Sequence, residues 1–130
     1  MLFRSLCMQA KYTEASEALT EAQRQFLDIG DVLGAAQCLQ SLGDILRMQH
    51  KYTQASEALT EAQRQFLDIG SALGAAQCLR GLGDILCMQA KYTEASKALT
   101  EAKRQFFNIG DAQGAAHCSE ILNDILHNNA

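Results

Sequence analysis

Residues 51–90 read KYTQASEALTEAQRQFLDIGSALGAAQCLRGLGDILCMQA, and this stretch decides the fold. The same 40-residue unit precedes it at 11–50 and follows it at 91–130. About 33 of the 40 positions agree between the first two copies, and about 25 agree between the second and third. Residues 1–10 match the end of a unit. Such a period indicates a repeat architecture in which each copy is one supersecondary unit.

Each unit contains two helical patterns. In the first pattern, apolar residues recur at steps of three and four, which is the spacing of one helix face: Tyr52, Ala55, Leu59, Ala62, Phe66 and Ile69. The second pattern has a broader apolar surface: Ala35, Ala36, Cys38, Leu39, Leu42, Ile45 and Leu46. A helix that is apolar on two sides needs neighbours on two sides, so the second pattern predicts the inner helix of a stack.

Short breaks separate the two patterns. A glycine, suited to a left-handed C-cap, follows each copy of the first pattern at Gly30, Gly70 and Gly110. An N-cap residue for the next helix comes directly after it, as Asp31, Ser71 or Asp111. The other joint, at 49–51 and its copies, leaves only a few residues for a turn, which forces the two helices to run antiparallel.

These patterns predict an all-α fold: a solenoid of antiparallel helix hairpins forming a single domain over residues 1–130. One hairpin cannot bury its own apolar faces, whereas stacked copies bury them jointly. We expect about seven helices, counting a short N-terminal stub within residues 1–10. No segment alternates with a period of two, so no sheet is predicted.

Composition excludes several functional classes. The formal net charge is −4, which argues against a nucleic-acid partner and, more weakly, against anionic membranes. No apolar run approaches the roughly 20 residues that span a bilayer. The start, residues 1–7, does not resemble a signal peptide. We therefore expect a cytoplasmic protein with no membrane or nucleic-acid partner.

No residues combine into a convincing chemical site. The five cysteines follow the repeat and none lies two residues from another, so we expect small buried hydrophobes rather than zinc ligands. His117 and His127 lie about three helical turns apart, too far to share a metal. Ser41, Asp44 and His50 lack the strained turn and oxyanion loop that a nucleophilic triad needs. We expect no enzyme activity, no metal and no cofactor.

One motif spans both patterns. Leu39-x-x-Leu42-Gly43-x-x-Leu46, followed by Tyr52-x-x-Ala55-x-x-x-Leu59-x-x-Ala62, resembles the tetratricopeptide repeat and recurs along essentially the whole chain. The period of 40 exceeds that family's usual ~34 residues and is similar to the longer repeats of kinesin light chains and scaffold proteins. Asn123 replaces the motif's glycine in a final, more polar helix, which suits a solvent-facing cap.

The resemblance implies a right-handed superhelix whose concave wall consists of the second-pattern helices. It also implies a protein–protein interaction scaffold that binds a peptide or helix of a partner in this groove. Carried over position by position, the groove residues are Gln37, Gln40, Asp44, Arg47, Met48, Gln77, Arg80, Asp84, Cys87, Met88, His117, Glu120 and Asp124.

Two ladders of polar residues run through this set. Asp44, Asp84 and Asp124 place one carboxylate in each repeat, which favours a basic or amide-rich partner. Aspartate at these positions, and Gln40 where the resemblance would require lysine, exclude the capture of chaperone tails. The simpler alternative is a solvated helix face that duplication has repeated.

A second functional class is self-assembly. The first ten residues leave an apolar end at Leu2, Phe3 and Leu6, and the stacking surfaces of the copies are nearly identical. Copies of the chain could therefore join head to tail or exchange helices as a structural segment of a larger protein.

Overall fold

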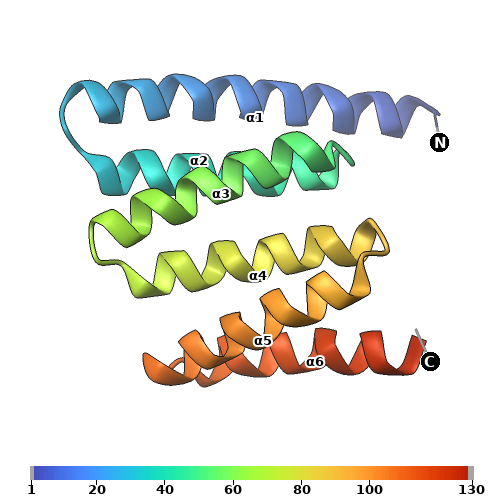
Figure 1. Cartoon of the computed structure of the whole chain (residues 1–130). Helices are drawn as coiled ribbons and strands as arrows, with labels where there is room; N and C mark the ends of the chain where they lie inside the picture. The colour runs from blue at the N-terminus through green and yellow to red at the C-terminus, as the bar shows by residue number, and fades with distance from the viewer. Residues whose placement is uncertain (1, 129–130) are drawn as a thin grey trace.

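The computed structural model describes the backbone of residues 2–128 and the side chains of residues 7–127. Six α-helices make up the described chain (Figure 1): α1 Leu2–Asp28, α2 Val32–Met48, α3 Tyr52–Asp68, α4 Ala72–Met88, α5 Tyr92–Asn108 and α6 Ala112–Asn128. Each helix packs against its neighbours in sequence. The predicted all-α stack of helix hairpins is confirmed, and no strand occurs in residues 2–128.

The predicted caps form at every first-pattern to second-pattern joint. Gly30, Gly70 and Gly110 have φ values of 79°, 77° and 78°, in the left-handed region that glycine adopts without strain. After them, Asp31, Ser71 and Asp111 each accept a hydrogen bond from a backbone amide in the first turn of the next helix. The positions at which α2, α4 and α6 begin therefore follow from local chemistry.

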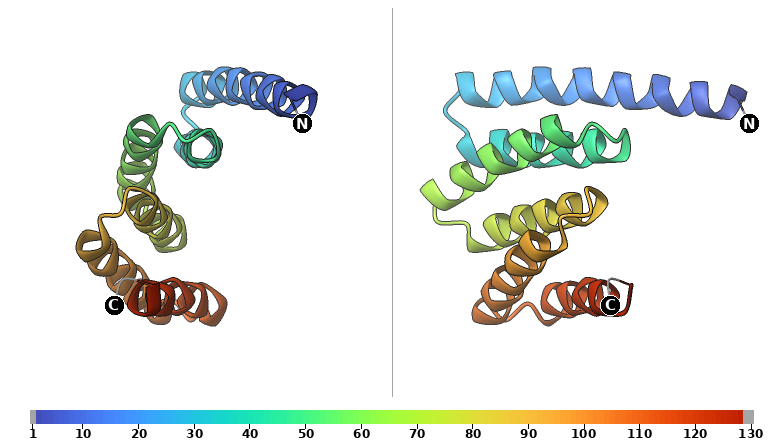
Figure 2. Two further views of the ribbon diagram at one scale, coloured as in Figure 1. Left: turned by 90° about the vertical axis from the view of Figure 1, so that its right-hand side faces the viewer. Right: turned by 45° about the vertical axis from the view of Figure 1, so that its right-hand side comes forward.

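The helices fall into an inner and an outer set. We call α2, α4 and α6 the inner helices, because α2 contacts α4 and α4 contacts α6. We call α1, α3 and α5 the outer helices, and among the described residues they do not contact one another. The left view of Figure 2 shows the helices along an arc, with α3 and α5 on its outer side.

Two apolar cores hold this arrangement together. One joins α2, α3 and α4 around Leu59 and Phe66, and the other joins α4, α5 and α6 around Leu99 and Phe106. These four side chains are at most 2% exposed. Ile69, expected on the apolar face of α3, is instead 41% exposed, because it lies beyond the last turn of that helix. Among its described side chains, residues 7–28, outer helix α1 contributes none to either core.

Glycines on the inner helices set the helix separation. A Cβ atom at Gly43 would lie 2.7 Å from Cγ of Leu59, and one at Gly83 would lie equally close to Leu99. At Gly74 a Cβ atom would lie 2.3 Å from the Phe66 ring. Real Cβ contacts are not this short, so any larger residue would push the helices apart.

The predicted N-terminal stub is wrong, and with it the count of seven helices. Helix α1 runs for 27 residues without a turn and extends past the other helices in Figure 1. At the two equivalent turns, His50 and Ala90 have φ values of 61° and 60°. Such strain persists only where packing compensates it. At the matching position of α1, Ala10 lies within the helix, and alanine is a strong helix former.

The side chains of Leu2, Phe3 and Leu6, predicted to form an apolar end, lie outside the described residues.

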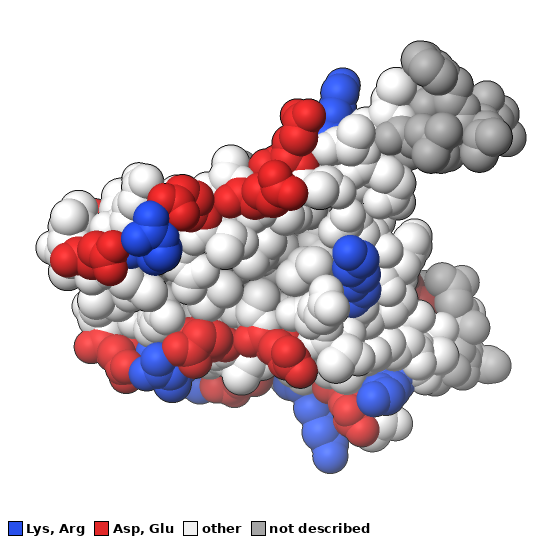
Figure 3. All heavy atoms as spheres, turned by 90° about the horizontal axis from the view of Figure 1, so that it is seen from above, with Lys and Arg blue, Asp and Glu red and all other residues white. Residues whose placement is uncertain are grey.

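Ion pairs form along each of the outer helices. Arg24, Arg64 and Arg104 each bind the glutamate three residues earlier. Hydrogen bonding to Arg104 lowers the pKa of Glu101 to about 2. Figure 3, viewed from the α1 side, shows acidic side chains in two rows with basic side chains among them. These pairs are solvent-exposed, and such pairs contribute little to stability.

We predict that Gly74→Ala lowers the free energy of unfolding by about 1–3 kcal/mol through overpacking against Phe66. This loss would appear despite the roughly 1 kcal/mol by which alanine favours a helix over glycine. Urea denaturation followed by circular dichroism measures it. Gly34→Ala is the matched control: it faces Phe26, whose ring is only half-buried and can move. Equal losses in both variants would contradict the prediction.

Candidate functional site

All of the predicted groove residues lie on the inner helices. Their exposure varies. Six are exposed: Gln37, Met48, Met88, His117, Glu120 and Asp124. The other seven are half-buried: Gln40, Asp44, Arg47, Gln77, Arg80, Asp84 and Cys87. The resemblance therefore placed these residues on one set of adjacent helices, but it did not distinguish free side chains from those engaged in packing.

Four of them line one pocket of about 340 Å³ between α4, the start of α5, and α6. The pocket has acidic groups and apolar walls. From the predicted set it contains Asp84, Cys87, Met88 and Asp124. The structure does not bring Gln37, Met48 or Glu120 into this pocket.

Sequence reasoning missed the remaining pocket residues, Tyr92, Ile121 and Ile125. Tyr92 was assigned to the motif core, and Ile121 and Ile125 belong to the apolar surface of α6. A signal was present at position 121, where isoleucine replaces the Ser41 and Gly81 of the earlier copies. An added apolar side chain at a position that is otherwise small indicates a local change of surface.

The sequence repeat changes at a position related to the pocket. The Tyr12 hydroxyl lies 3.7 Å from the Met48 sulfur, and the Tyr52 hydroxyl lies 3.3 Å from the Met88 sulfur. By the repeat, the partner of Tyr92 would be residue 128, which is asparagine rather than methionine. The side chain of residue 128 is not described, and Tyr92 lines the pocket.

Arginines accompany the predicted aspartate ladder. Burial raises the pKa of Asp44, and the charges of Arg47 and Arg80 oppose this rise. Burial likewise raises the pKa of Asp84, opposed by Arg47, His117 and Arg80. The α2–α4 part of the groove therefore carries both signs of charge. On α6 the two acidic groove residues, Glu120 and Asp124, are exposed.

Several polar groove residues bind within the protein. Gln40 donates a hydrogen bond of 3.1 Å from Nε2 to Oε1 of Gln77, which joins α2 to α4. The Arg80 guanidinium lies 5.4 Å from the centroid of the Phe106 ring, a cation–π contact. In contrast, Nε of Arg47 is buried and has no hydrogen-bond partner among the described residues. Arg47 is thus the groove residue with an unused donor.

The cysteines of the inner helices α2 and α4 are not activated. Burial raises the pKa of Cys87 and, more strongly, raises that of Cys78 to about 12, so both thiols stay protonated and are poor nucleophiles. Cys78 and Cys118 are fully buried, as predicted, whereas Cys7 is exposed. Within the described part of the chain, no three His, Cys, Asp or Glu side chains gather as a metal site.

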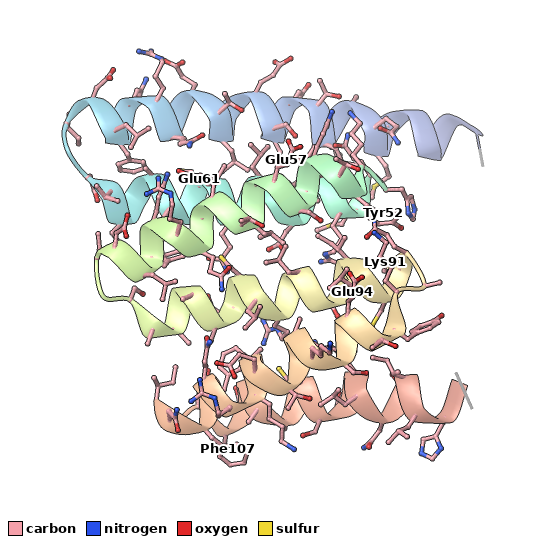
Figure 4. All side chains as sticks on the ribbon, in the orientation of Figure 1. Tyr52, Glu57, Glu61, Lys91, Glu94 and Phe107 are labelled. Carbon is pink, nitrogen blue, oxygen red and sulfur yellow. The ribbon has the colours of Figure 1, made fainter. Side chains whose placement is uncertain are left out.

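The outer helices present a different surface. In Figure 4, Glu57 and Glu61 lie on α3, and Phe107 points away from the neighbouring helices. Phe107 is 63% exposed. None of these three residues lines the pocket between α4 and α6. The acidic outer side chains can therefore be changed without touching the groove.

The chain matches the family model described as SNAP, soluble NSF attachment protein, over residues 4–118. The chain belongs to the SNAP family. This family has a helical-repeat, non-enzymatic adaptor fold and takes part in protein–protein interactions. The match supports the predicted class of helical-repeat protein but not the narrower long tetratricopeptide variant. A comparison with curated proteins finds no match. Among residues 2–128 of this SNAP-family chain, no helix has the length and apolar character to cross a bilayer.

We predict that Asp84→Asn raises the free energy of unfolding at pH 7. Burial raises the pKa of Asp84 in the folded state, so the ionised carboxylate disfavours folding at neutral pH, and asparagine removes that charge. The gain should shrink as the pH falls towards about 3.9, the usual aspartate pKa, because the wild-type carboxyl then becomes neutral. Urea denaturation across this pH range measures the difference.

Asp124→Asn is the matched control, because Asp124 is the exposed copy of Asp84. It should leave the free energy of unfolding nearly unchanged throughout. A loss of stability in Asp84→Asn at neutral pH would show that attraction to Arg47 and Arg80 outweighs burial.

Proposed function

We propose that the chain is a protein-binding adaptor that holds a helix or peptide of a partner in the groove formed by α2, α4 and α6. The observation that carries this proposal is the pocket between α4 and α6, which combines two carboxylates, Asp84 and Asp124, with apolar walls. A concave apolar site with a few polar groups is the usual form of a binding site.

The partner segment has a defined chemistry. An apolar side chain enters the pocket against Met88, Tyr92 and Ile121. A lysine, arginine or amide group next to it pairs with Asp84 and Asp124, because opposite charges across an interface give specificity. The segment is therefore amphipathic and mainly basic or amide-rich.

The family description names the first partner to examine. It describes attachment to NSF, and we extend that description to this chain as a proposal. The chain acts without catalysis, cofactor or metal. The groove follows the long-repeat tetratricopeptide arrangement in which the second-pattern helices, here α2, α4 and α6, line the concave wall. The odd number of cysteines fits a reducing compartment, so the cytoplasm is the proposed location.

Self-assembly is the second candidate, and the incompletely covered face of α1 favours it. One feature opposes the head-to-tail form. Asn123 on α6 stands where Gly43 and Gly83 receive a leucine of the next helix. A Cβ atom at that position would collide with an incoming leucine, as the 2.7 Å contacts at Gly43 and Gly83 show. An in-register stack of copies therefore requires a rearrangement of α6.

We predict that removing the three groove carboxylates abolishes partner capture. Affinity capture of purified NSF, and of proteins in an extract of the native cell, would compare the wild type with the groove variant Asp44→Asn, Asp84→Asn and Asp124→Asn. The matched control removes three exposed outer carboxylates: Glu14→Gln, Glu17→Gln and Glu57→Gln. Both variants change the net charge equally, so only position distinguishes them.

The groove proposal requires a partner that the wild type and the outer variant retain and that the groove variant loses. Partners held equally by all three proteins would rule out the groove carboxylates as the recognition feature. Light scattering over a range of protein concentrations separates the second candidate, since a constant monomer mass would count against self-assembly.

A further inference from the structure

The turns that end the outer helices carry exposed apolar side chains. Every copy has two of them, one in the last helical turn and one directly before the glycine. They are Leu27, Leu67 and Phe107 at the first position and Ile29, Ile69 and Ile109 at the second. All six are between 40% and 76% exposed. The three turns lie along one side of the stack, at the left in Figure 1. We call the six residues the turn strip.

The exposure of the turn strip belongs to the repeat itself. Leu67 is 60% exposed although helices precede and follow its own hairpin in the stack. It lies off the apolar face of α3, beside polar and charged side chains of the same helix. The unit at 91–130 agrees with the unit before it at only about 25 of 40 positions, yet it keeps Ile109 and has the larger Phe107 in place of leucine. Copying of an unselected surface does not account for this.

The apolar area of the turn strip is large enough for a protein interface. Leu33 and Leu73, at the starts of α2 and α4, are 46% and 45% exposed and widen the strip at the first two turns. A standard interface buries about 800 Å² of each partner, of which about 57% is apolar. The strip and these two leucines expose roughly 600 Å² of apolar surface, which exceeds the roughly 450 Å² that such an interface needs.

The net charge changes along the turn strip. Residues 23–31 carry a net charge of −1, residues 63–71 are neutral and residues 103–111 carry +1. The third turn is the most basic, because it has Lys103 in place of a glutamine and Asn108 in place of an aspartate. The charged residues in the three ranges are Arg24, Asp28 and Asp31; Arg64 and Asp68; and Lys103, Arg104 and Asp111.

A second copy of the chain fits this gradient when it runs in the opposite direction. A two-fold axis through the middle turn sets the acidic first turn of each copy against the basic third turn of the other, and the neutral turns against each other. A parallel arrangement would oppose like charges at both ends. The helices lie along an arc in Figure 2, and rotation about an axis that bisects an arc superimposes the arc on itself in reverse. Two-fold dimers are the commonest homo-oligomers.

We infer that the turn strip is the interface of an antiparallel homodimer of this chain, with Leu67 and Ile69 next to the two-fold axis. Apolar contact holds the two copies together, and the opposite charges at its ends fix the register. The pocket between α4 and α6 lies at the other end of the helices, since Met88 ends α4 and Tyr92 begins α5. The dimer therefore leaves the pocket open and does not depend on the groove proposal. Being closed, it also differs from head-to-tail stacking.

Sedimentation velocity of the full chain over a range of concentrations measures the dimer, under reducing conditions because Cys7 is exposed. We expect a mass that rises to that of two chains and no further. Leu67→Glu places a charge at the centre of the strip, and we expect it to weaken the dimer at least about tenfold. Leu126→Glu is the matched control, because Leu126 is 69% exposed but lies near the end of α6, away from the turns.

Circular dichroism checks that both variants fold. A monomer at every concentration, growth beyond two chains, or equal effects of the two substitutions would overturn the inference.

Charge exchange tests the antiparallel register separately. Asp28→Lys and Lys103→Glu each oppose like charges across the interface, and we expect each to weaken the dimer at least about threefold. The protein with both substitutions again opposes unlike charges and should recover the dissociation constant of the wild type. Asp28 binds Arg24 in an exposed ion pair, so its loss affects folding little. A double variant that dimerises no better than the single variants would contradict the antiparallel arrangement.

Discussion

Leu59 and Leu99 each occupy a position that only glycine leaves open on the neighbouring inner helix. The approach is so close that a single methyl group at Gly43 or Gly83 would collide with the leucine. Helix separation, the two apolar cores and the regular spacing of the hairpins all follow from this contact, because packed interiors do not tolerate an added carbon without displacement. Helices α1 and α6 each lack one side of this leucine–glycine contact. Outer helix α1 presents a leucine without a glycine, and inner helix α6 presents Asn123 in place of the glycine.

The candidate site arises where the repeat departs from itself. In two places the hydroxyl of an outer-helix tyrosine contacts the sulfur of a methionine at the end of an inner helix: Tyr12 contacts Met48, and Tyr52 contacts Met88. At Tyr92 the sequence supplies asparagine instead, and Ile121 and Ile125 of α6 form the walls of a pocket. Identical repeats would give a uniform surface with no preferred place for a ligand. Divergence in the unit at 91–130 accompanies a local feature that combines apolar walls with carboxylates.

Local chemistry made much of the fold predictable from the sequence. Apolar spacing indicates each helix, and the glycines that end one helix precede the capping residues of the next, Asp31, Ser71 and Asp111. Each of these signals depends only on residues a few positions away in the sequence. The straight course of α1 was not predictable in the same way, because residues 6–16 and 86–96 have the same sequence and the chain turns only at the second of them. The site was predicted less well. Position in the repeat identified the inner helices, but the engagement of Gln40 with Gln77 and the nearness of Arg47 to Asp84 depend on contacts between helices.

The separation of the outer helices has a mechanical consequence. Inner helices contact one another along the arc, while α3 and α5 are joined only through α4. Bending about the inner line changes the gaps between outer helices without breaking a contact between them. The stack is therefore joined along its inner edge, and its described outer helices are not joined to one another. A change of curvature would therefore alter the spaces between outer helices first, and the buried leucine–glycine contacts would act as its fixed points.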